Sequence, residues 1–218
     1  MRQSTIAPRA SVFGLGNVLL GDDAFGPFTI EIFRSQFQCG PAIEIMDLGT
    51  PGLDLAPYLY GRNFVILVDA VKADGEPGTV AVYRESDLSE CAAQLRVTDH
   101  DPGLLESIAH LRLLGHAPVE LAIIGVIPES CLFGAGLSSK IDAAVAVAMD
   151  QIVRILIEQG VDCKPRSQPL RPKLWWNPIA PPILESLVGC TPVRDSLRLV
   201  DRYENGKHGN ENGGAISF

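Results

Sequence analysis

Short apolar runs alternate with amphipathic stretches along most of the chain. The run FVILVDA is apolar up to Asp69. Such continuous apolarity is typical of a central strand in a parallel sheet, which is buried on both faces. Similar runs predict further strands at about 10–13, 42–47, 79–83 and 119–126.

Apolar residues that recur at helical spacing predict helices between these strands. We expect helices at about 24–37, 101–115 and 138–159, and a short one that carries Leu53, Leu55 and Leu59. The strand at 79–83 follows its predecessor too closely for a crossover helix, so we expect it to pair antiparallel or to lie at an edge. The alternation predicts a doubly wound α/β sheet with helices on both faces.

Composition divides the chain near Cys163 into a domain at 1–163 and a proline-rich, weakly structured tail at 164–218. The tail holds 8 of the 18 Lys and Arg residues but only 5 of the 26 acidic ones. The net charge of −8 opposes non-specific nucleic-acid binding, and no apolar stretch is long enough to span a bilayer. We therefore expect a soluble cytoplasmic protein with no nucleic-acid partner and no membrane insertion.

The five cysteines form no CxxC pair, and their number is odd. This pattern is typical neither of a disulfide framework nor of a zinc ribbon. We expect reduced thiols with no catalytic role.

The segment FGLGNVLLGDDAFG, residues 13–26, is rich in glycine and carries two adjacent acids. Gly14 and Gly16 match the start of a dinucleotide-binding fingerprint, but Leu19 stands where its third glycine is required. Asp22 and Asp23 would also repel a phosphate. A nucleotide-binding α/β module is therefore the weaker alternative for this segment.

Polar residues follow the ends of three predicted strands, and a histidine lies in a later loop. In an open α/β sheet these positions meet at one edge. The residues are Asn17, Asp22, Asp23, Asp47, Gly49, Thr50, Asp69 and His100. Carboxylates and imidazole are ligands for divalent transition metals, so the pattern predicts a metal site.

Each of these residues also has a purely structural alternative. Asp22 could accept backbone N–H groups at the start of the next helix. Asp69 could satisfy loop amides, and His100 could be an exposed loop histidine. The metal hypothesis depends on the three residues acting together.

The motifs GLGNVLLGDDAFG, DLGTPG, VILVDAV and IIGVIPES resemble, in this order, those of the hydrogenase maturation endopeptidases. The resemblance covers about residues 10–166 and leaves out the tail. It implies a three-layer α/β/α fold around a five-stranded, mainly parallel sheet with one antiparallel strand. It also implies cleavage of a C-terminal extension from the precursor of an [NiFe] hydrogenase large subunit.

By this resemblance, Asp23, Asp69 and His100 are the expected catalytic and metal-binding residues. The metal is nickel supplied by the precursor, or another divalent metal in the isolated protein. Asn17, Asp22, Asp47, Gly49 and Thr50 are the expected substrate-recognition residues. The partner is the large-subunit precursor and the enzyme is expected to be a monomer; a non-catalytic, metal-dependent assembly chaperone is the alternative function.

Overall fold

The computed structural model describes residues 9–84, 87, 103–174 and 176. Its main sheet has five strands in the order β3-β1-β4-β6-β5. Four of them run parallel: β1 (Ala10–Leu15), β3 (Ile43–Gly49), β4 (Phe64–Ala70) and β6 (Glu120–Val126). The fifth, β5 (Val80–Arg84), pairs antiparallel with β6 at the sheet edge, as its short connection predicts.

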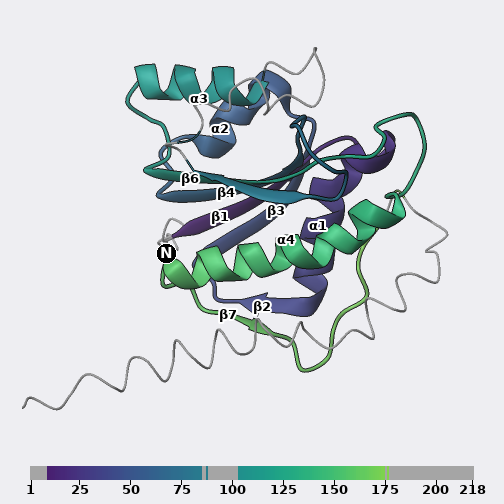
Figure 1. Cartoon of the computed structure of the whole chain (residues 1–218). Helices are drawn as coiled ribbons and strands as arrows, with labels where there is room; N and C mark the ends of the chain where they lie inside the picture. Colours follow the sequence, from purple (N-terminus) through teal and green to yellow (C-terminus); the bar gives the residue numbers. More distant parts are fainter. Residues whose placement is uncertain (1–8, 85–86, 88–102, 175, 177–218) are drawn as a thin grey trace, which may run out of the picture.

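Helices cover both faces of this sheet (Figure 1). One face carries α1 (Phe25–Gln36) and α4 (Ser139–Glu158), and the other carries α2 (Ala56–Leu59) and α3 (Gly103–Leu113). Two 3₁₀ turns, η1 (Gly21–Ala24) and η2 (Gly52–Leu55), precede α1 and α2. The predicted three-layer α/β/α architecture is confirmed. Among the described helices, none combines the length and apolarity that a membrane span requires.

The large sheet is buried because alternate residues of each strand face opposite helical layers. In β4, Ile66 and Val68 pack in the core beneath α1 and α4, and Val65 and Leu67 pack beneath α2 and α3. All four side chains are fully buried. The strand is continuously apolar because both of its faces are buried away from water.

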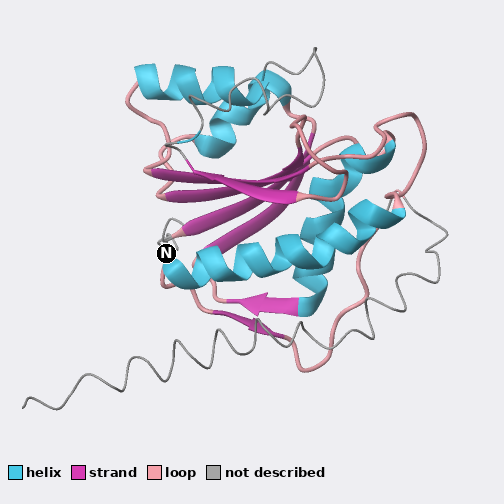
Figure 2. Ribbon diagram, viewed as in Figure 1, coloured by secondary structure: helices cyan, strands magenta, loops and turns pink. Residues whose placement is uncertain are grey.

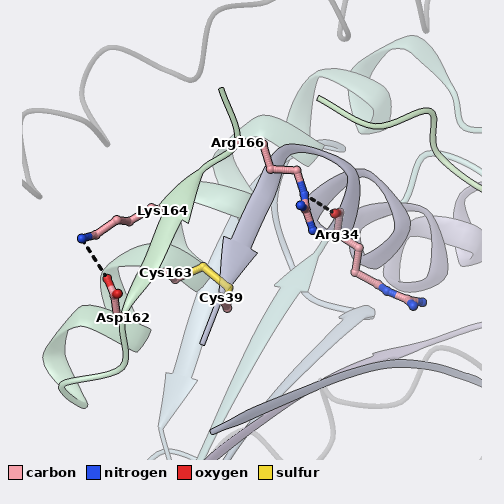
Figure 3. Close-up of a disulfide and its surroundings, with 6 residues drawn as sticks. All are labelled: Arg34, Cys39, Asp162, Cys163, Lys164 and Arg166. Atoms are coloured by element: carbon pink, nitrogen blue, oxygen red, sulfur yellow. Dashed lines mark hydrogen bonds and ion pairs between the residues drawn. A yellow bond between two sulfur atoms is a disulfide. The ribbon is translucent and has the colours of Figure 1, made fainter. Parts of the chain in front are cut away.

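A second, two-stranded sheet was not predicted (Figure 2). Its strands, β2 (Phe37–Cys39) and β7 (Cys163–Pro165), pair antiparallel with Cys39 opposite Cys163. A disulfide joins these two residues (Figure 3). The expectation of reduced thiols is therefore wrong for this pair, since the fold brings together cysteines that lie 124 positions apart. Cys131 is a free thiol.

The first described residues after Cys163 lie on the body of the protein. Lys164 and Pro165 continue the ladder with β2, and Leu174 and Trp176 are buried in the main core. Residues 177–218 lie outside the described part, so the division at 163/164 and the weak structure of the tail stay predictions.

Candidate active site

The carboxyl ends of β1, β3 and β4 meet above a small cavity of about 30 Å³. Asp23 and Asp69 both line it, although 46 positions separate them in the chain. Gly49, the last residue of β3, and Thr50, which follows it, form another part of its wall. Four predicted site residues, which lie in or after three neighbouring strands, therefore surround one cavity, as the strand-end argument requires.

Close packing of α1 against the sheet determines the position of the β1–α1 connection, which carries Asp23. A Cβ atom on Gly26 would collide with the carbonyl groups of Leu15 and Val68. Gly26 therefore lets the first turn of α1 contact β1 and β4 directly. At Gly16 the backbone has φ of +130° and a Cβ atom would overlap the carbonyl of Asp23.

Asp23 lies on η1 with only 7% of its surface exposed. Its Oδ2 atom accepts a hydrogen bond from the backbone N–H of Asn17 at 2.7 Å. The Asn17 side chain in turn accepts from the N–H of Leu19 at 3.0 Å. Asn17 therefore shapes the loop and fixes the carboxylate of Asp23; its predicted contact with substrate stays a prediction.

Asp69 is the penultimate residue of β4 and is partly exposed, unlike the buried residues on either side. Its Oδ1 atom accepts a hydrogen bond from the N–H of Ala70 at 2.8 Å. Acceptance of a backbone N–H is the structural alternative that we considered for Asp69 from the sequence. It coexists with the position of Asp69 in the cavity wall.

Asp22 is 1% exposed, and its carboxylate binds the loop between β6 and α4. Its Oδ2 atom accepts from the N–H groups of Glu129 and Ser130 at 2.9 Å each, and from the Ser138 hydroxyl at 3.1 Å. Its Oδ1 atom accepts from the Ser138 N–H at 2.6 Å. The carboxylate thus binds both ends of the 129–138 loop, and the second end, Ser138, is the N-cap of α4.

Asp47 lies in β3 and is not part of the cavity wall. Its Oδ1 atom accepts from the N–H of Gly49 at 2.9 Å, and Gly49 has φ of +59°. Partial burial raises the pKa of the Asp47 carboxyl; this hydrogen bond and the charge of Arg34 oppose that rise. Asp47 therefore shapes the turn that presents Gly49 and Thr50 to the cavity.

Cys131 also lies near this site, and no pattern in the sequence marks it as a site residue. Burial first, and then the charges of Asp23, Asp22 and Asp69, raise the pKa of its thiol to about 11. The thiol therefore stays protonated at neutral pH and is a poor nucleophile. Its proximity to the acidic site arises from the 129–138 loop, which only the fold brings beside η1.

Two carboxylates on one cavity suit a divalent metal, because oxygen donors from separate loops leave coordination positions for other ligands. His100, the predicted third ligand, lies outside the described residues. Within the described residues no cluster of three His, Cys, Asp or Glu side chains is arranged to hold a metal ion. Asp23 and Asp69 are thus the two predicted ligands that the structure places at one cavity.

Comparison with known proteins identifies relatives of one kind. The family model for hydrogenase maturation proteases matches residues 28–155. The hydrogenase 2 maturation protease of Escherichia coli K12 is 33% identical over 159 residues, which are 72% of this chain and 96% of the relative. The hydrogenase expression/formation protein HupD of Rhizobium leguminosarum is 28% identical over 82% of this chain and 85% of its own length.

Solved structures agree with this comparison. The hydrogenase maturating endopeptidase HybD from E. coli superposes with a TM-score of 0.68 at 32% identity, over 73% of this chain and 98% of the other. The hydrogenase 2 maturation peptidase from a Thaumarchaeota archaeon gives a TM-score of 0.52 at 31% identity, over 68% and 97% of the two chains.

Proposed function

The chain belongs to the hydrogenase maturation protease family, and on this premise we propose that it removes the C-terminal extension of a nickel-loaded [NiFe] hydrogenase large-subunit precursor. The observation that carries the proposal is the meeting of Asp23 and Asp69 at one cavity. Family membership favours this function over the nucleotide-binding alternative.

In this proposal Asp23 and Asp69 bind the nickel of the precursor, and His100 completes the set. Carboxylate and imidazole groups are suitable ligands for Ni²⁺. The bound metal supplies Lewis-acid chemistry, either to the scissile carbonyl or to the attacking water. The nickel arrives as part of the substrate, so a precursor without metal lacks the group that these residues recognise.

Recognition of a protein rather than a small molecule agrees with the surroundings of the cavity. A volume of about 30 Å³ holds only a small part of any ligand. Leu132 and Phe133, which follow Cys131, are 78% and 84% exposed, and Leu19 on the Asp23 loop is 52% exposed. Exposed apolar side chains on neighbouring loops are typical of protein-binding surfaces.

The two loops that carry these apolar residues are held together. The N–H of Gly134 donates to the carbonyl of Leu19, and the N–H of Gly21 donates to the carbonyl of Gly134, both at 2.9 Å. Asp22 binds the same loop through its carboxylate. In the proposed function Asp22 therefore contributes to recognition indirectly, through the loop that it holds.

Gly49 and Thr50 line the cavity, and in this proposal they contact the chain segment to be cleaved. We propose Asp47 as a positioning residue for them, because its hydrogen bond forms the turn. The enzyme is proposed to act as a monomer in the cytoplasm.

A processing assay tests this function. Purified protein is mixed with nickel-loaded precursor, and the large subunit is followed on a denaturing gel. Asp23→Asn, Asp69→Asn and His100→Ala should each reduce cleavage at least about 100-fold and leave the melting temperature nearly unchanged. Asp74→Asn is the matched control, because Asp74 is an exposed acid that follows β4 outside the cavity.

An intact precursor after incubation with the wild-type protein would overturn the proposed cleavage. If the precursor nevertheless bound, the chaperone alternative would replace it. Equal cleavage of precursors with and without nickel would remove the metal from recognition. Full activity in Asp23→Asn or Asp69→Asn would remove that carboxylate from the reaction.

A further inference from the structure

A second cavity, of about 290 Å³, lies away from the candidate active site and shares no lining residue with it. It is formed by the end of α1, by β2 and β3, and by the segment that follows β7. The family model ends at residue 155, so this segment lies beyond the part of the chain that defines the family.

The segment is fixed to the body by four kinds of contact. The Cys39–Cys163 disulfide and the β2–β7 ladder hold its start (Figure 3). Burial of Leu174 and Trp176 in the core holds its end. Hydrogen bonds to the last turn of α1 hold the middle, because the carbonyls there have no partner inside the helix.

These hydrogen bonds place an arginine at the helix end. The N–H of Arg166 donates to the Gln36 carbonyl at 2.7 Å, and its Nε donates to the Arg34 carbonyl at 3.2 Å. The N–H of Leu170 donates to the Ser35 carbonyl at 2.8 Å. A cation beside a helix C-terminus is favourable, so α1 and the segment stabilise each other.

The cavity combines an apolar floor with a cationic rim. Phe37, Ile43 and Ile45 form the apolar floor, and Leu170, which also lines the cavity, is 52% exposed. Four cationic side chains also line the cavity: Arg34, Arg166, Arg171 and Lys173.

Within the part of the chain that the structure describes, only one acid lines this cavity. It is Glu31, and its carboxylate already binds Arg34 at 2.8 Å. Among the described residues, Arg171 and Lys173 form no ion pair. The cationic residues therefore exceed the acids at this place, in a chain whose net charge is −8.

We propose that this pocket binds an acidic peptide segment of a partner protein, in which carboxylates flank an apolar side chain. Arg171 and Lys173 are exposed at the rim, and the Arg34 side chain is 49% exposed, so the cations reach a ligand that extends beyond the cavity. The apolar floor accepts the central side chain. Guanidinium groups bind carboxylates through paired hydrogen bonds.

The ligand class follows from where the charges lie. A small free dicarboxylate would be held by cations buried inside the cavity, whereas Arg171 and Lys173, which line it, are exposed to solvent and reach a longer ligand. An inorganic anion would gain nothing from the apolar floor. The overall negative charge of the chain repels acidic partners at long range, so binding depends on local contacts at short range.

Fluorescence anisotropy with a labelled peptide tests the proposal on the full-length, oxidised protein. The probe has glutamates on both sides of a central leucine, and a second probe has glutamines in their place. The glutamate probe should bind, and binding should weaken with added salt. The double substitution Arg171→Ala and Lys173→Ala should weaken it about tenfold, which corresponds to two exposed ion pairs.

Arg154→Ala is the matched control, because Arg154 is an exposed arginine of α4 that does not line the pocket. It should leave the affinity unchanged, and all variants should keep the wild-type melting temperature. Precursor cleavage by the double variant should also be unchanged, which separates this proposal from the proposed protease function.

Three results would overturn the proposal: no binding of the glutamate probe by the wild-type protein, equal affinity of the glutamine probe, or equal affinity in the double variant. Displacement of the glutamate probe by inorganic phosphate at an equal concentration would indicate a general anion site, and it too would overturn peptide recognition.

Discussion

The carboxylate of Asp22 organises the loop beside the active site, and removing it should destabilise the whole protein. Asp22 is 1% exposed and accepts four hydrogen bonds from three residues of the 129–138 loop. Three of the donors are backbone N–H groups. In Asp22→Ala these amides lose their acceptor, although the substitution removes few atoms.

The size of the effect follows from these donors. A buried donor left without a partner costs about 1–3 kcal/mol. Glu129 and Ser130 have exposed surface, so water replaces part of their loss, and values near the lower limit apply. Three such amides together give a loss of about 3–4 kcal/mol in the free energy of unfolding.

Two further substitutions remove only part of this hydrogen bonding, so they should cost less stability. In Asp22→Asn the carbonyl still accepts, but the amide group must face at least one N–H donor, which predicts a loss of about 2 kcal/mol. Ser138→Ala removes only the hydroxyl donor at 3.1 Å and should cost about 0.5–1 kcal/mol. The α4 N-cap is unaffected otherwise, since the Ser138 side chain makes no capping bond within its own helix.

Urea denaturation followed by circular dichroism measures these differences. With a slope of about 2–3 kcal/mol/M, Asp22→Ala should lower the midpoint by about 1–2 M. The order of the losses is the sharper criterion: Ala first, then Asn, then the Ser138 variant. A loss below about 1 kcal/mol for Asp22→Ala, or a larger loss for the Ser138 variant, would refute the assignment of Asp22 as the anchor of this loop.

Three further predictions concern the cysteines and Asp47. The rate of Cys131 alkylation, followed peptide by peptide, should be slow at pH 8 and rise toward pH 11. Asp69→Asn removes a negative charge and should shift this rise to lower pH. Fast alkylation of Cys131 at pH 8 would contradict the raised pKa. Replacing Cys39 and Cys163 by serine should cost about 2–4 kcal/mol in denaturant titrations, since the disulfide closes a long loop; unchanged stability would contradict this. Because burial raises the Asp47 pKa, the wild type should lose stability relative to Asp47→Asn as the pH rises from about 4 to 7, and pH-independent differences would contradict it.

The positions of the strands could be predicted because each buried position of a strand requires an apolar residue. Every residue of β4 before Asp69 is buried, so the apolar run in the sequence is the strand itself. The meeting of Asp23 and Asp69 followed from topology alone, since parallel strands place their carboxyl ends at one edge.

The small β2–β7 sheet could not be predicted in the same way. Each strand has only three residues, too few for a pattern of alternation to be distinct from chance. Pairing of Cys39 with Cys163 depends on the position of β7 after α4, which no spacing of cysteines in the chain encodes. The odd number of cysteines even argued against a disulfide, although one pair with free thiols gives the same count.

The partners of Asp22 were equally hidden, because three of its four donors are backbone amides that any residue supplies. The sequence shows the aspartate but not the backbone amides that it binds. The same holds for Gly26, whose requirement comes from the carbonyls of Leu15 and Val68 rather than from its own helix. Local sequence therefore indicates which residues are special, and the fold determines the reason.

The acidic pair Asp22–Asp23 gains its two roles from the geometry of η1. A 3₁₀ turn has three residues per turn, so consecutive side chains point about 120° apart. One carboxylate thus faces the 129–138 loop while its neighbour faces the cavity. Two adjacent buried negative charges repel each other, and the four donors around Asp22 offset that cost on one side. The tight turn before α1 therefore lets one short motif hold the 129–138 loop and also place a carboxylate in the cavity wall.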